Sequence, residues 1–155
     1  LPGETLAGVL ENQGLDDSDR AQAIRLATLA LAELHRLGFT HADAMAENVT
    51  IDLEAGSAHW FDFETVHDSN RSLAWQRADD LRALMFSCAA RTSPGRRPAT
   101  VHLTLDTYRD GGVERELASS VTSAFRRALA FHLSQAAVSF EADRQMARLL
   151  RERRR

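Results

Sequence analysis

One long apolar segment constrains the fold of this chain more than any other feature. A helical pattern starts after a capping candidate at Asp16, Asp17 or Ser18, runs to about Leu37 and is closed by Gly38. Its apolar residues wrap most of the helix circumference: Ile24, Leu26, Ala27, Leu29, Ala30, Leu31, Leu34 and Leu37. Because a helix that is apolar nearly all round must be buried, we expect it to lie at the centre of a core.

A short β-hairpin is predicted after this helix and a polar loop. The loop spans His41–Asn48, and the alternating segment Val49–Leu53 follows it as a strand. A glycine-containing turn then leads into a return strand, Ala58–Phe63. Reflection about the centre of the turn pairs Asn48 with Asp62, so we expect these two polar side chains at the same end of the hairpin.

The rest of the pattern is helical, which predicts an α+β domain that is mostly α. A length of 155 residues fits a single domain, 1–155. Loops are predicted at residues 92–98 and at the helix-stopping pair Gly111-Gly112. The other helices are predicted at Thr5–Asn12, Arg77–Arg91, Leu103–Arg109, Glu114 to about Leu133, and Phe140–Arg154.

Composition excludes several classes of function. A formal charge of -3 argues against a general affinity for nucleic acid or membranes, and the arginines at residues 151–155 are expected to be a solvated helix end. The single cysteine, Cys88, excludes an intrachain disulfide and is expected to be buried packing. No apolar run is long enough to span a bilayer, so we expect a cytoplasmic protein. All 19 basic residues are arginine, so no lysine of this chain can take part in a mechanism.

The polar loop carries a motif with a chemical meaning. His41, Asp43 and Asn48 follow the spacing H-x-D-x-x-x-x-N, and Asp62-Phe63-Glu64 begins fourteen residues after Asn48. This pattern resembles the catalytic loop and the D-F-G motif of the protein-kinase-like superfamily, in the D-F-E form of the choline and aminoglycoside kinases. The resemblance implies a C-terminal kinase-like lobe, with a long central helix, a small hairpin at the catalytic loop and several following helices. It is specific from about Leu1 to Leu84.

The resemblance also implies roles for five residues. Asp43 would be the catalytic base, and Asn48 and Asp62 would hold Mg²⁺, which prefers oxygen ligands. His41 would organise the loop, and Asp80 would brace its backbone. Phosphoryl transfer fits such a set, because it needs positioning and charge neutralisation more than covalent help. The cofactors implied are Mg²⁺ and ATP, while the residues that would bind the nucleotide stay unknown.

Each role has a structural alternative. Asp43 could cap the loop, Asn48 could simply begin a strand, and Asp80 could be an ordinary exposed helix acid. Asp62 is flanked by aromatic residues, which predicts an apolar setting where an uncompensated carboxylate is costly. The other histidines show no metal-ligand spacing and are expected in the surface or the core: His35, His59, His67, His102 and His132. The segment Tyr108-Arg109-Asp110 could line an acceptor groove but is expected to be an exposed helix end.

The predicted function is transfer of the ATP γ-phosphate to a hydroxyl group, which we expect to belong to a small molecule. The D-F-E form favours this branch, and the 17 residues between Asp62 and Asp80 leave little room for a long regulatory segment. Met45 stands where related kinases carry lysine or histidine, which favours an alternative, a pseudokinase or lobe-only binding module without phosphotransfer. A purely helical interaction domain is a third alternative, and it would require the hairpin to be absent.

The chain is expected to be part of something longer. Leu1-Pro2-Gly3 is not a natural start, and neither a glycine-rich phosphate cover nor a strand lysine is present. An N-terminal lobe would then be supplied upstream or by another chain, and its absence would leave an apolar face open to self-association. By itself the chain is expected to bind nucleotide weakly and to transfer little or no phosphate.

Overall fold

The computed structural model describes residues 3–119, 148–150 and 152, and within them the chain is α+β and mostly helical, as predicted. Most of the predicted helix at Phe140–Arg154 and most of the one from Glu114 lie outside the described residues, as does His132. The described residues 148–150 and 152 are helical, as predicted. The elements in chain order are β1 (Glu4–Thr5), α1 (Leu6–Glu11), α2 (Asp17–Arg36), the 3₁₀ turn η1 (Ala46–Asn48), β2 (Val49–Asp52), β3 (Ser57–Trp60), α3 (Leu73–Ala90), α4 (Arg97–Tyr108) and α5 (Gly111–Ser119).

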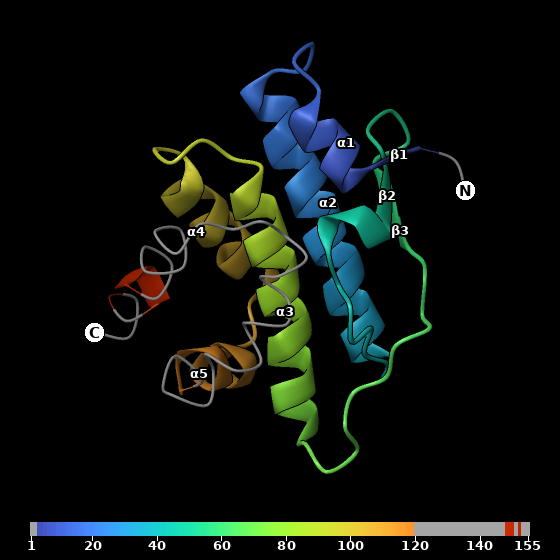
Figure 1. The fold of residues 1–155 in the computed structure, drawn as a ribbon, viewed down its shortest axis with the longest axis vertical. Helices are drawn as coiled ribbons and strands as arrows, with labels where there is room; N and C mark the ends of the chain where they lie inside the picture. Colours follow the sequence, from blue (N-terminus) through green and yellow to red (C-terminus); the bar gives the residue numbers. More distant parts are fainter. Residues whose placement is uncertain (1–2, 120–147, 151, 153–155) are drawn as a thin grey trace.

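Two long helices form the centre of the molecule. Figure 1 shows α2 and α3 side by side, with the sheet against α2 and with α5 beside α3. The helix α4 contacts both α2 and α3. The first helix begins with a capping box, in which the Asp16 carboxylate accepts a hydrogen bond from the Asp19 N–H at 2.9 Å and the Asp19 carboxylate accepts one from the Asp16 N–H. Its end at Arg36, followed by Gly38 with φ of 91°, matches the predicted end.

The prediction that α2 is buried all round was wrong along one edge. Ile24, Ala27 and Leu31 are buried, but Leu29 is 49% exposed and Leu37, just past the helix, is 58% exposed. The reason is geometric: the neighbours of α2 are the sheet, α1, α3 and α4, and among the described residues no element covers the remaining strip.

A three-stranded antiparallel sheet replaces the expected two-stranded hairpin, with the order β1-β2-β3. In β1, Glu4 and Thr5 pair with Ile51 and Thr50, and Thr5 also caps α1 by accepting a hydrogen bond from the Gly8 N–H at 3.2 Å. A two-residue strand has no alternation to detect, so the sequence pattern missed it. The presence of the hairpin removes the purely helical alternative.

The three helices after the sheet all begin earlier than predicted. Ser72 starts α3 by accepting a hydrogen bond from the Trp75 N–H at 3.2 Å. In α4, Pro98 is the second residue of the helix, where its missing N–H has no helical partner to lose, so it belongs to the first turn and not to the preceding loop. The helix α5 begins at the expected stop signal, because the Asp110 carboxylate accepts hydrogen bonds from the N–H groups of Gly112 and Val113, at 2.8 and 3.1 Å.

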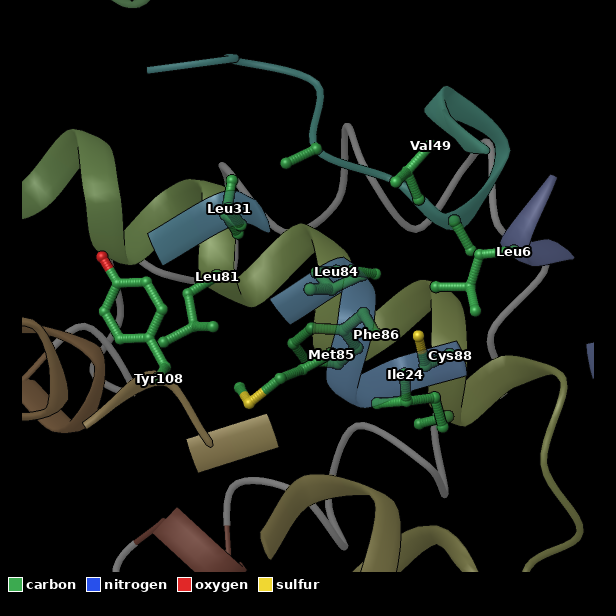
Figure 2. Close-up of a cluster of buried hydrophobic side chains, with 14 of the residues drawn as sticks. Leu6, Ile24, Leu31, Val49, Leu81, Leu84, Met85, Phe86, Cys88 and Tyr108 are labelled. Carbon is green, nitrogen blue, oxygen red and sulfur yellow. The ribbon is translucent and has the colours of Figure 1, made fainter. Parts of the chain in front are cut away.

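The core gathers around α3, which is buried along most of its length. Figure 2 shows Leu81, Leu84, Met85 and Cys88 of this helix meeting side chains from other elements, such as Ile24 of α2. Cys88 is fully buried, as predicted, and burial raises the pKa of its thiol to about 12. None of the helices in the described ranges combines the length and apolarity needed to cross a membrane.

Candidate functional site

Asp80 of α3 holds the His41–Asn48 loop from its buried side. One carboxylate oxygen accepts a hydrogen bond from the His41 N–H at 2.8 Å, and the other accepts one from the Ala42 N–H at 2.7 Å. Asp80 is 1% exposed, which excludes the alternative of an ordinary exposed helix acid. These bonds fix the backbone of the loop at its first two residues, and Ala42 takes the left-handed conformation there, with φ of 65°.

A buried histidine and a tyrosine complete this support, a role that the sequence pattern did not predict for either residue. The His35 ring lies 2.9 Å from Asp80 through Nε2 and 2.6 Å from the Tyr108 hydroxyl through Nδ1. Tyr108 is only 8% exposed, so the expectation of an exposed helix end was wrong, and burial raises the pKa of its hydroxyl. One signal could have revealed His35: it lies four residues after Leu31, on the same buried face of α2.

His41 joins the loop to the end of β3. Its Nε2 lies 2.8 Å from the Phe61 carbonyl oxygen, and a carbonyl only accepts, so Nε2 carries the hydrogen. The ring packs edge-on against Trp60 and lies 4.5 Å from the Phe63 ring, centroid to centroid. The contacts of His41 are therefore those of a residue that fixes the loop against the hairpin.

Asp43 and Asn48 lie on the open side of the loop and contact each other. The Asn48 side-chain amide donates to the Asp43 backbone oxygen at 2.9 Å and to the Asp43 carboxylate at 3.0 Å. The donor in both contacts is the side-chain nitrogen, and the Asn48 side-chain oxygen, which can only accept, is not used in either of them. Both residues are partly exposed. Asn48 also ends η1 directly before β2, so a structural role coexists with any chemical one.

Asp62 differs from expectation in two respects. It is exposed, so the argument that an apolar setting demands a cation there was wrong. The reflection that paired it with Asn48 was also off by one residue: Val49 pairs with Trp60, and the Phe61 N–H donates to the Asn48 carbonyl oxygen at 3.0 Å. The chain then turns at Asp62, whose φ is 65°, so β3 ends before the predicted Phe63.

The oxygen-bearing side chains fit a hard cation in their chemistry. Among the described residues, no group of three or more His, Cys, Asp and Glu side chains is arranged to hold a metal. Mg²⁺ needs fewer protein ligands, because it keeps several waters and takes phosphate oxygens when a nucleotide is bound. The uncommitted Asn48 side-chain oxygen and the exposed Asp62 carboxylate are ligands of the type it prefers.

Met45 stands where a kinase-like loop would carry lysine or histidine. It has no charge and is 6% exposed, so it brings no positive charge to the open side of the loop. Glu47, the second acidic residue of the loop after Asp43, is bound by Arg91 at the end of α3 through an Nη2–Oε1 contact of 2.5 Å. The hydrogen bonds described thus link His41, Asp80, Asp43 and Asn48 into one loop structure, with Asp62 attached through its neighbour Phe61.

Comparisons with known proteins do not assign this chain to a family. No protein-family model matches it, and neither a curated protein nor a solved structure gives a significant match. The chemistry of the site is therefore argued from its geometry and from the spacing of its motif.

Proposed function

We propose that this chain is the catalytic-loop lobe of a kinase-like phosphotransferase that transfers the ATP γ-phosphate to an alcohol group, most simply that of a small molecule. One observation carries the proposal. The Asn48 side-chain nitrogen donates to the backbone oxygen and to the carboxylate of Asp43, which orients that carboxylate and leaves the Asn48 side-chain oxygen for a cation. The same pair, at the same spacing, is what the motif H-x-D-x-x-x-x-N supplies in kinases.

The proposed roles follow from these contacts. Asp43 accepts the proton of the attacking hydroxyl group. The oxygen of that hydroxyl bonds to the γ-phosphorus, and the bond between the γ-phosphorus and the bridging oxygen of ADP breaks. Asn48 and Asp62 hold Mg²⁺, which supplies positive charge to the phosphate oxygens when bound. His41 and Asp80 act on the reaction through the loop backbone alone, because their side chains are bonded to it or to the hairpin.

Nucleotide binding is tested by thermal unfolding with and without magnesium-ATP. A ligand that binds only the folded state raises the melting temperature, and we expect such a rise for the unmodified chain. Asp62→Asn keeps the size of the side chain but removes its charge, and should abolish the rise. The matched control is Glu54→Gln, an exposed acid in the turn of the same hairpin, which should leave it intact. A rise unchanged in Asp62→Asn contradicts the metal assignment.

Catalysis is tested in the longest form of the protein that hydrolyses ATP or transfers phosphate from it. Asp43→Ala should lower the rate of ADP release in the presence of an alcohol acceptor by about 10²- to 10⁴-fold, the contribution typical of a positioned general base. Asn48 loses one hydrogen-bond partner in this variant, so magnesium-ATP affinity is measured beside the rate. Equal rates for both proteins refute Asp43 as the base.

One observation favours the second candidate, a pseudokinase or binding module. Met45 is buried, and the chain has no lysine to contact the transferring phosphate. In this case magnesium-ATP neither raises the melting temperature nor turns over. The two candidates thus differ in the first experiment already, before any acceptor is known.

A further inference from the structure

A pocket lies away from the loop, between the N-terminal half of α2, the end of α1 and the start of α4. Its volume is about 460 Å³, within the range of small-molecule sites, about 300–1,000 Å³. Its apolar walls come from three helices: Leu10, Ala21, Ile24, Ala99 and Leu103. A site of this size and lining accepts an apolar body of a few rings or a short chain.

The rim of the pocket carries more positive than negative charge. Arg20, Arg91 and Arg96 line it, and Asp17 is its only carboxylate among the described residues. Arg96 forms an ion pair with Asp17, and Arg20 lies 3.4 Å from the same carboxylate oxygen. Two guanidinium groups thus share one carboxylate. Because both partners of the Arg96–Asp17 pair are 58% exposed, the pair is weak, and Arg96 can turn to a stronger anionic partner.

Arg91 connects this pocket with the candidate site. Its guanidinium contacts Glu11 at 3.1 Å, Glu47 at 2.5 Å and the Ser87 carbonyl oxygen at 2.9 Å. Glu47 lies in η1, directly before Asn48, and the second oxygen of its carboxylate is buried without a hydrogen-bond partner in the described chain. The Arg91–Glu47 ion pair therefore joins η1, which presents Asn48, to the end of α3, beside the hydrogen bond from the Ala46 N–H to the Ser87 hydroxyl.

We propose that this pocket binds a small amphipathic anion, a carboxylate or sulfonate on an apolar body, and that Arg91 transmits its binding to η1. The apolar body fills the space between α1, α2 and α4, while the anion engages Arg96 and competes with Glu47 for Arg91. Release of Glu47 loosens η1 and so displaces Asn48. The binding step does not depend on the function proposed above; only the consequence for Mg²⁺ and nucleotide does.

Binding is tested with the probe 8-anilinonaphthalene-1-sulfonate, which has an aromatic body and one sulfonate. We expect saturable fluorescence at one probe per chain, and a melting temperature that rises with probe concentration, because the probe binds the native state. A probe that binds partly unfolded chains lowers the melting temperature instead, and that result overturns the proposal.

Four variants locate the probe. Arg96→Gln removes the exposed cation and should weaken binding by about tenfold, the usual effect of losing one charge-assisted hydrogen bond. Ala99→Phe fills the pocket from an exposed position of α4 and should abolish saturable binding. Arg25→Gln removes an exposed arginine of α2 outside the pocket and should leave affinity unchanged. Equal affinity in Arg96→Gln, Ala99→Phe and Arg25→Gln overturns the proposal. The fourth variant, Val66→Ser, changes the exposed loop after β3, and loss of binding in this variant alone also overturns it.

Coupling is measured without nucleotide, by amide hydrogen exchange of residues 44–50. The Ala46 N–H donates to the Ser87 hydroxyl at 2.9 Å, so loosening of η1 should speed its exchange when the probe is bound. Unchanged exchange at saturating probe refutes the coupling through Arg91. If magnesium-ATP does not bind but the probe does, the function proposed for the loop fails and the pocket stands.

Discussion

The inner and outer faces of the His41–Asn48 loop use aspartate in opposite ways. On the inner face, Asp80 is 1% exposed and both of its oxygens accept hydrogen bonds from the loop backbone. On the outer face, Asp62 is exposed, and within the described chain its carboxylate has no recorded hydrogen bond or ion pair. The comparison teaches that burial distinguishes a carboxylate that builds the loop from one that is available to a ligand, although both look alike in the sequence.

The same comparison holds for the backbone. Ala42 and Asp62 both have φ of 65°, a left-handed conformation that disfavours side chains with a Cβ. At Ala42 the strain is held in place by the Asp80 bonds. At Asp62 it is held by the preceding residue, because Phe61 is bound through its N–H to Asn48 and through its carbonyl to His41. Two strained residues thus flank the site, as is common where a loop is pre-organised.

Removal of the inner carboxylate, that of Asp80, should have the largest effect on stability of the changes that test the difference between the two faces. Asp80→Ala leaves two backbone N–H groups and the His35 ring without their buried partner, which should lower the free energy of unfolding by about 3–5 kcal/mol. Urea denaturation measures the loss. Asp62→Ala is the matched control on the outer face and should change stability by less than about 0.5 kcal/mol. Similar losses in the two variants contradict the distinction between the faces.

Alkaline unfolding tests the buried side of the molecule further, through Cys88 of α3. Burial raises the pKa of its thiol to about 12 from a usual 9.0, so the folded state keeps a proton that the unfolded state releases. The stabilisation is complete below pH 9.0 and is lost as the pH rises toward about 12. Between pH 9 and 11 it should fall by about 2–3 kcal/mol.

The control for this prediction is Cys88→Ala, which lacks the thiol and should lose less stability over the same interval. Tyr108 contributes to the alkaline loss in both proteins, because burial raises its pKa as well. The difference between the two pH profiles therefore isolates Cys88. Parallel profiles would mean that water reaches the thiol in the folded state.

A smaller change tests the support behind Asp80. Tyr108→Phe removes the hydroxyl that lies 2.6 Å from the His35 Nδ1 and should lower the free energy of unfolding by about 1 kcal/mol. His35 then keeps its bond to Asp80 but is free to change its orientation. Hydrogen exchange at the His41 and Ala42 amides should rise in this variant, whereas Thr107→Val, next to it in α4, should leave their exchange unchanged.

The central helix and the hairpin could be predicted because their signals are local. The capping residues and apolar period gave the extent of α2, and alternation gave β2. Starts of helices were less predictable, since Ser72, Pro98 and Asp110 act through single caps or first-turn positions that many loops also contain. The strand β1 was missed because its two residues are fixed by pairing with Ile51 and Thr50, not by their own pattern.

The site was predictable in composition but not in environment. The motif placed Asp43 and Asn48 in one loop, and the structure joins them by two hydrogen bonds that the spacing alone did not predict. The burial of Asp80 and the exposure of Asp62 could not be read from the sequence, because each depends on how α3 and the hairpin end lie relative to the loop. The prediction of an apolar setting for Asp62 was wrong, although aromatic residues flank it in the sequence. The Phe63 ring contacts His41, while the Asp62 carboxylate is exposed.

The smallest expected effect separates backbone from side chain at Asp62 itself. Asp62→Gly relieves the left-handed strain but adds freedom to the unfolded chain, so stability should rise by about 0.5 kcal/mol at most. Asp62→Ala keeps a Cβ at the same φ and should not gain this increment, which makes it the matched control. Both variants lack the carboxylate, so both should lose the magnesium-ATP stabilisation equally. A clear loss of stability in Asp62→Gly would mean that the Asp62 side chain holds the turn, and the outer face would then be built like the inner one.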